Sequence, residues 1–123
     1  MNELTGQCMC GAVTFKVTGE GTGIVSCHCK ECQQLHGNYN PMWVVNKEDF
    51  TVRGEDSLEW YNSSEEKSRG FCKKCGAAMF MRQETGPKML ISVGCIDDTV
   101  GMENIKNVFT QDAGTYYVMS EES

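Results

Sequence analysis

The sequence predicts one small, mostly β domain that binds metal. Short segments with the two-residue alternation of half-buried strands recur at regular spacing, and turn residues separate them. Most of the eight cysteines crowd into three tight groups, whereas disulfide frameworks usually spread cysteines along the chain to close long loops. At 123 residues the chain is long enough for one modest core and too short for two.

The first predicted strand covers residues 13–17, because Val13, Phe15 and Val17 alternate with polar residues. A glycine-rich turn at 19–23 follows, and residues 24–26 lead into the central cysteine group. Beyond that group, residues 33–36 predict one or two helical turns, which the glycine and asparagine at 37 and 38 would end.

The remaining elements are short strands, so we expect mostly antiparallel pairing. One of them begins at Pro41, and a strand start tolerates its missing N–H. The most apolar strand would carry Cys95 and end at two aspartates. Residues 108–109 and 116–118 could add a strand or two, and residues 120–123 should fray. These strands are predicted at 41–45, 50–53, 57–61, 77–80 and 88–96.

The central cysteine group, Cys27, Cys29 and Cys32, places three thiols within six residues. Sulfurs at this spacing can reach one ion, at about 2.3 Å from each sulfur. A zinc with three protein ligands keeps a fourth position for water or substrate, which is the design of a catalytic site. His28 lies between two of these ligands and is expected to point away from the ion. His36 as a fourth ligand would make the site structural, and this alternative stays open.

The two outer cysteine groups share one motif, at residues 10–15 and 75–80. In each, a cysteine is followed by Gly-Ala and then by a short strand that contains a phenylalanine. A glycine after the second cysteine allows a positive φ that turns N–H groups toward the sulfurs. Two such knuckles predict a closed, structural four-thiolate zinc site, which would join the first strand to a late one. Its ligands would be Cys8, Cys10, Cys72 and Cys75.

Composition excludes several classes of function. The chain has 11 Lys+Arg against 17 Asp+Glu and a net charge of -6, which is unfavourable for binding nucleic acid. We expect no signal peptide and no membrane span, and therefore a soluble, cytoplasmic protein. In a reducing cytosol these cysteines favour metal binding. Disulfides in an exported protein remain an alternative, and the spacings do not match those of ferredoxin iron–sulfur clusters.

The ordered motifs resemble those of the glutathione-dependent formaldehyde-activating enzyme family, also called the centromere-protein-V domain, over about residues 5–110, with a tail at about 111–123. The set is more specific than any single C-x-x-C. Where the family usually has a late tryptophan, this chain has Tyr116 and Tyr117. The motifs are G-Q-C-x-C-G at 6–11, C-H-C-x-x-C at 27–32, F-C-x-x-C-G at 71–76 and V-G-x-I-D-D at 93–98.

The resemblance implies a zinc-bearing β-tent fold of two β-sheets, like that of methionine-R-sulfoxide reductases. It implies two zincs per chain, one on the four outer cysteines and one on the central three. It also implies carbon–sulfur lyase activity that makes or breaks an S-hydroxymethyl adduct of glutathione or a related thiol. The partners would be a small thiol and an electrophile, with no nucleic acid and no membrane; a homo-oligomer is compatible with the sequence.

Coordination chemistry supplies a mechanism. Three thiolates on Zn²⁺ leave a net charge of -1 and one exchangeable position. A substrate thiol that binds there loses its proton and can attack an electrophilic carbon such as formaldehyde; the reverse reaction cleaves the C–S bond. The carbonyl oxygen then needs a proton, and His36, Glu31 and Tyr39 lie close enough in sequence to supply it.

Two other functions stay open. One is a non-catalytic zinc module that binds a protein partner, although the acidic balance and the lack of a basic extension weigh against a chromatin or microtubule role. The other is a redox enzyme like the methionine-R-sulfoxide reductases, with Cys95 as the attacking thiol. The simpler interpretation of Cys95 is a small buried hydrophobic residue.

Overall fold

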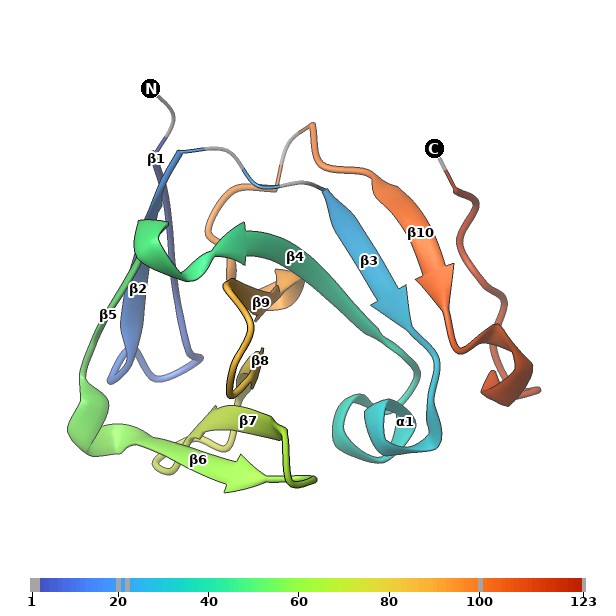
Figure 1. The fold of residues 1–123 in the computed structure, drawn as a ribbon, viewed down its shortest axis with the longest axis horizontal. Coiled ribbons are helices and arrows are strands. Elements are labelled where there is room, and N and C mark those ends of the chain that lie inside the picture. The colour runs from blue at the N-terminus through green and yellow to red at the C-terminus, as the bar shows by residue number, and fades with distance from the viewer. Residues whose placement is uncertain (1–2, 20, 22, 100, 123) are drawn as a thin grey trace.

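A computed structural model describes residues 3–19, 21, 23–99 and 101–122 (Figure 1). These residues form ten strands in two sheets, one short α-helix and four 3₁₀ turns. The prediction of a mostly β fold with two sheets and one short helix is therefore confirmed. That the fold is of the β-tent type stays a prediction.

The smaller sheet is antiparallel and has the strand order β1-β2-β5. The larger sheet has the order β10-β3-β4-β9-β8-β7-β6. The strands of the smaller sheet are β1 (Glu3–Gln7), β2 (Thr14–Thr18) and β5 (Phe50–Arg53). Those of the larger sheet are β3 (Ile24–Cys27), β4 (Asn40–Asn46), β6 (Leu58–Asn62), β7 (Lys67–Cys72), β8 (Ala78–Gln83), β9 (Lys88–Ser92) and β10 (Asn104–Val108).

One strand pair departs from the expected antiparallel pattern, because β10 runs parallel to β3. After β9 the chain makes a 3₁₀ turn at Val93–Cys95 and crosses to the far side of β3 before β10 begins. A parallel pair needs such a long connection, whereas an antiparallel pair needs only a hairpin. The strand predicted at 88–96 consequently ends at Ser92, and Cys95 lies on the turn, not on a strand.

The core fills the space between the two sheets. The alternation predicted for residues 13–17 holds, since Val13, Phe15 and Val17 are all buried. Phe80 of β8 reaches across from the larger sheet and packs edge-on against Phe15, with ring centroids 5.5 Å apart. Gly6 of β1 bridges to Ile96, where an added Cβ would lie 2.2 Å from the Cys95 carbonyl oxygen. Only glycine fits at this junction.

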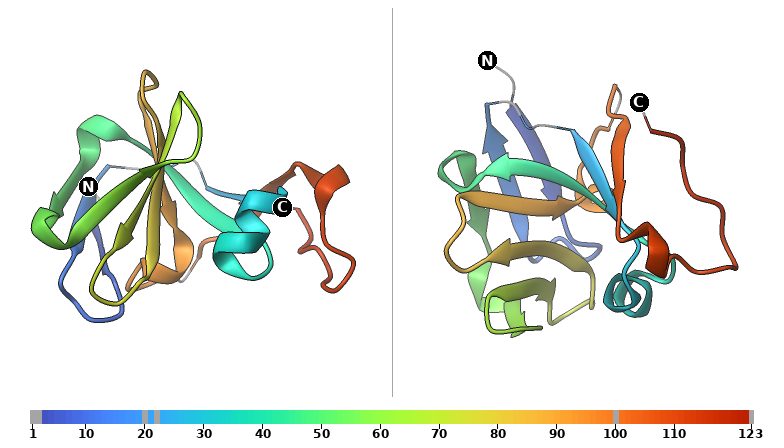
Figure 2. Two further views of the ribbon diagram at one scale, coloured as in Figure 1. Left: turned by 90° about the horizontal axis from the view of Figure 1, so that it is seen from below. Right: turned by 45° about the vertical axis from the view of Figure 1, so that its right-hand side comes forward.

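The helix and the C-terminal tail lie at the other end of the molecule from the smaller sheet (Figures 1 and 2). The single α-helix, α1 (Lys30–His36), begins inside the central cysteine group, three residues earlier than predicted. Residues 116–118 form no strand. The expected fraying at 120–123 is not seen at Ser120 and Glu122, which both bond to Asn107; residue 123 lies outside the described residues.

Candidate functional site

The fold brings the two outer cysteine groups together. The sulfurs of Cys8, Cys10, Cys72 and Cys75 all lie within 4.8 Å of one another. The Cys8 and Cys10 sulfurs are 3.7 Å apart, and those of Cys10 and Cys72 are 3.8 Å apart. Four sulfurs placed tetrahedrally at 2.3 Å from one ion would be about 3.8 Å apart. The donor set therefore fits a closed zinc site.

The two knuckles share their backbone geometry. In each, the N–H of the first cysteine, Cys8 or Cys72, donates to the carbonyl five residues later at 3.0 Å. In each, the glycine after the second cysteine donates its N–H back to the carbonyl of the first. Gly11 and Gly76 both have φ of +80°, which L side chains rarely adopt. The matching Gly-Ala motifs thus encode matching loops, as the sequence predicted.

The central cysteine group, Cys27, Cys29 and Cys32, forms a second cluster whose sulfurs lie within 4.8 Å of one another. Cys27 ends β3, and Cys29 caps α1, where its sulfur accepts the N–H of Cys32 at 3.4 Å. Cys29 is only half-buried, whereas the other two are buried. In the described part of the chain no histidine, acidic residue or further cysteine joins this cluster. His36 lies outside it.

Crowding separates the pKa values of the central thiols. The hydrogen bond with Cys32 lowers the pKa of Cys27 to about 5, although burial acts in the opposite direction. The same contact, together with burial, raises the pKa of Cys32. A cluster in which one sulfur is readily a thiolate is a good metal ligand set, because the thiolate is the form that binds metals.

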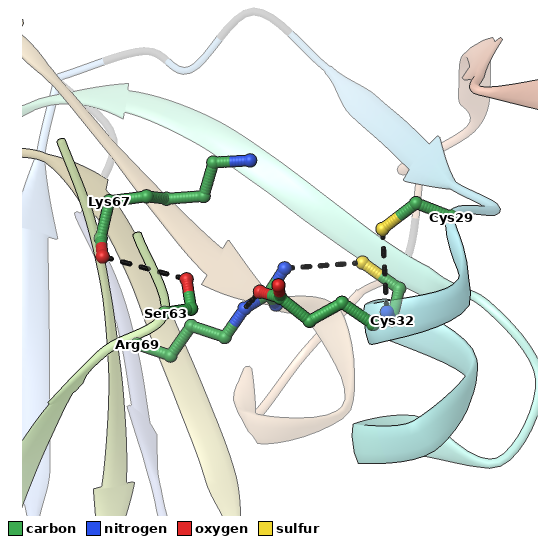
Figure 3. Close-up of polar contacts among 6 residues, drawn as sticks. Cys29, Cys32, Ser63, Lys67 and Arg69 are labelled. Atoms are coloured by element: carbon green, nitrogen blue, oxygen red, sulfur yellow. Dashed lines mark hydrogen bonds and ion pairs between the residues drawn. The ribbon is translucent and has the colours of Figure 1, made fainter. Parts of the chain in front are cut away.

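Arg69 links the helix to the sheet at this cluster. It comes from β7, and its Nη2 donates to the Cys32 sulfur at 3.5 Å, while its Nε pairs with Glu31 of α1 (Figure 3). Burial alone would lower the pKa of Arg69, but its contacts with Cys32 and Glu31 raise it. The same ion pair lowers the pKa of Glu31 against the opposite effect of burial. Glu31 is therefore an ionised anchor for Arg69 and a poor proton donor.

A cavity of about 180 Å³ lies between α1 and the larger sheet. Its polar groups include the guanidinium of Arg69 and the imidazole of His36, and most of the other lining residues are apolar. Burial, and secondarily the positive charge of Arg69, lowers the pKa of His36 to about 4. At neutral pH His36 is thus an uncharged base beside a permanent cation. The cavity is lined by Leu35, His36, Tyr61, Arg69, Gly70, Phe71, Ala78, Phe80 and Ser92.

His28 points away from the sulfurs, as predicted. Its Nε2 lies 2.9 Å from Oδ1 of Asn107, which also accepts a bond from Asn104, and its Nδ1 lies 2.8 Å from the Tyr117 hydroxyl. Since Asn107 Oδ1 is an acceptor, Nε2 carries a proton, and in the neutral ring Nδ1 accepts from Tyr117. Tyr39 packs against the His28 ring at 4.8 Å, so it belongs to this support and does not line the cavity.

The model of the glutathione-dependent formaldehyde-activating enzyme family matches residues 3–112 of this sequence. The chain belongs to this family. An uncharacterized lyase of Schizosaccharomyces pombe is 27% identical over 86 residues, which are 70% of this chain and 62% of the fungal protein. The chain thus spans less than two thirds of the length of that relative. A crystal structure of a Rhodobacter sphaeroides protein has the same fold, with a TM-score of 0.64 and 20% identity over 84% of this chain and 98% of that one.

The sequence indicates all seven clustered cysteines of this family member, and the structure brings them together in the two predicted sets. It does not indicate Arg69, because a single arginine in the middle of the chain has no motif around it. Arg69 lies in β7, which begins at Lys67. The pairing of β7 with β6 and β8 is what carries Arg69 to α1.

Cys95 lies outside both clusters. It is half-buried, and its thiol faces the Ala78 carbonyl oxygen at 3.8 Å. Burial, together with the negative potential of Cys8 and Cys75, raises the pKa of Cys95 to about 11. A thiol that stays protonated is a weak nucleophile, which weighs against the redox alternative. Among the described residues, no helix has both the length and the apolar character of a membrane span.

Proposed function

We propose that the protein is a zinc-dependent lyase that forms or cleaves the carbon–sulfur bond of an S-hydroxymethyl-type adduct of glutathione or a related thiol. One observation supports this most strongly: three sulfurs cluster with no fourth ligand among the described residues, and Arg69, which contacts one of these sulfurs, lines a cavity together with His36. The family description and the name of the fungal relative agree with it.

The central three sulfurs suit Zn²⁺, which takes three protein ligands in catalytic sites and four in structural ones. When bound there, the ion would supply a position for the substrate sulfur and would lower the pKa of its thiol. The four-cysteine group would hold the structural zinc, so that the chain carries two. Since all eight cysteines are free thiols in the structure, the reducing cytoplasm is the compartment that we propose for it.

His36 is the group that we assign to proton transfer. As a neutral base it can accept the proton that the substrate thiol gives up. The sulfur electron pair then forms the C–S bond, the C=O π pair moves to oxygen, and the proton returns to that oxygen from His36. No electron leaves the pair of substrates, so the step needs no oxidant or reductant. Cleavage is the same sequence in reverse.

Exchange spectroscopy tests the proposal. Formaldehyde and glutathione form their adduct without an enzyme, so ¹³C exchange between free and adducted formaldehyde should be faster with the zinc-loaded protein. Cys29→Ser should abolish the acceleration, whereas Cys95→Ser should leave it unchanged. Zinc analysis should give two ions per chain. A single zinc per chain, or exchange that is no faster than in buffer, would overturn the proposal; acceleration lost in Cys95→Ser would favour the redox alternative.

A further inference from the structure

One donor of the Arg69 side chain is left without an acceptor. The side chain is only 7% exposed, and Nη1 has no hydrogen-bond partner among the described residues, although Nε and Nη2 are both engaged. Buried guanidinium groups are expensive to leave unsatisfied. The other such atom, Nε of Arg82, belongs to a guanidinium that stacks 3.8 Å from the centre of the Trp60 ring. Among the residues that the structure describes, no aromatic ring stacks on Arg69 in this way.

Arg69 also lines the cavity described above. A cavity of about 180 Å³ is smaller than the roughly 300–1,000 Å³ of sites that enclose a whole ligand. It therefore suits one end of a substrate, and the bulk of a thiol such as glutathione has to remain outside. Gly70, next to Arg69, contributes no side chain, and an added Cβ there would lie 3.1 Å from the Trp60 ring. The site is built for a compact group with one polar atom.

The contact with Cys32 places the guanidinium beside the cluster. Nη2 lies 3.5 Å from the Cys32 sulfur and Nη1 is attached to the same carbon, so a group that reaches Nη1 is held near the central cysteine group. In an S-hydroxymethyl adduct the oxygen is two bonds from the substrate sulfur. A planar guanidinium with several fixed donors can serve both sulfur and oxygen at once, which a single ammonium group cannot do as well.

We propose that Arg69 is a catalytic residue whose Nη1 donates to the oxygen of the one-carbon unit, while Nη2 remains on Cys32. This inference rests on the proposed function. As the C–S bond forms, the C=O π pair moves to oxygen, and Arg69 stabilises that developing negative charge until the proton arrives from His36. The site accordingly selects compact aldehydes, and adducts with an oxygen two bonds from sulfur.

Two probes of equal size test this in the cobalt-substituted protein, in which sulfur-to-cobalt absorption reports thiol binding without turnover. Thioacetate carries a carbonyl oxygen two bonds from the sulfur, which ethanethiol lacks, and it is already ionised at neutral pH, whereas ethanethiol is not. The ratio of their dissociation constants is compared between proteins, so the intrinsic difference between the probes cancels. Arg69→Gln should reduce the preference for thioacetate about tenfold or more, since hydrogen bonds to charged groups contribute that much. Arg53→Gln, the control that removes an arginine of the smaller sheet instead, should change it less than threefold.

Each outcome has one meaning. An equal ratio in wild type and Arg69→Gln would overturn the role of Arg69 and leave the proposed function intact. If neither probe alters the cobalt absorption, the open metal position itself is wrong. If Arg69→Gln does not fold, ¹⁵N spectra of the wild-type zinc protein decide. The arginines are Arg53, Arg69 and Arg82, and thioacetate should shift the Arg69 side-chain signals whereas ethanethiol should not; equal shifts would overturn the proposal.

Discussion

His36 is placed to exchange protons because burial and one neighbouring cation keep it neutral. It follows Cys32 by four residues, about one turn of α1, and it lines the same cavity as Arg69. Burial disfavours its charged form, and the cation disfavours it further. A neutral imidazole beside a fixed positive charge accepts a proton briefly and returns it readily, which suits a reaction that runs in both directions.

The pH dependence of His36 is the first prediction. Its pKa in the folded protein is about 4, below the ordinary value of 6.5. The unfolded chain therefore binds more protons between these values, and the stability that neutral His36 contributes is present above about pH 6.5 and is lost as the pH falls toward 4. NMR titration should show one of the two histidines titrating near pH 4. That signal should be absent in His36→Gln.

Substitution of His36 should also distinguish a role in proton transfer from a role in the packing of α1. His36→Gln is expected to slow formaldehyde exchange about 10²-fold or more, the typical contribution of a positioned acid–base group, while zinc content and thermal stability at pH 7 stay near wild type. Gln34→Ala, which changes an exposed position of the same helix, should slow exchange much less. Equal losses in the two variants would assign the effect to the packing of α1 and not to proton transfer.

At the scale of elements, the C-terminal tail supports the loop that carries the central cysteine group. Gln33 of α1 donates both to the His28 carbonyl, at 2.9 Å, and to the Asp112 carbonyl, at 2.7 Å. The His28 N–H donates to the Val108 carbonyl of β10. The parallel strand and the tail after it therefore hold the β3–α1 loop, and the tail lies beside α1 (Figure 2).

Loss of one tail contact tests this support. Tyr117→Phe keeps the ring that stacks on His28 but removes the hydroxyl, so Nδ1 of a fully buried histidine loses its partner. We expect the free energy of unfolding to fall by about 1–3 kcal/mol, and zinc to leave the central cluster faster. Tyr116→Phe is the matched control, because its hydroxyl bonds to Gly37 at the exposed surface. Denaturant unfolding and chelator kinetics measure both effects.

Local sequence patterns predict those elements that depend on contacts between residues close together in the sequence. The alternation at 13–17 and the Gly-Ala knuckles depend on neighbouring residues, so strand β2 and both turns were predicted correctly. The β1 strand was not, since Gly6 is there for its contact with the distant Cys95 carbonyl. The parallel placement of β10 depends on a crossover, and no pattern in residues 104–108 encodes its direction.

The residues of the site also fall into those that a local motif predicts and those that only long-range contacts bring there. The three cysteine groups are recognised by their spacing within a few residues, and their assembly into two clusters was predicted from the number of ligands that zinc requires. Arg69 contacts Glu31 and Cys32 across about 37 residues of sequence, as their separation shows, and no local signal marks it. The docking of Tyr117 on His28 is equally long-range.

For the whole molecule, the two clusters should differ in what they stabilise. The four-cysteine group ties the turn after β1 to the end of β7 and so joins the two sheets, whereas the central group lies within one short segment. Structural zinc in small domains contributes an apparent ~10–16 kcal/mol to folding. Cys75→Ser should therefore unfold the protein, while Cys29→Ser should remain folded with one zinc fewer. Circular dichroism and zinc analysis read out both; a folded Cys75→Ser protein with unchanged melting would contradict this.

The separation of the four-cysteine ligands along the chain also has a consequence for synthesis in the cell. Cys72, which contacts Cys10, follows it by 62 residues. At a translation rate of about 5–20 residues per second, Cys72 is synthesised roughly 3–12 s after Cys10. For this time a nascent chain displays reactive thiols that no ion yet protects, while the central loop is already complete. Oxidants present during translation should harm the newborn polypeptide far more than the mature one.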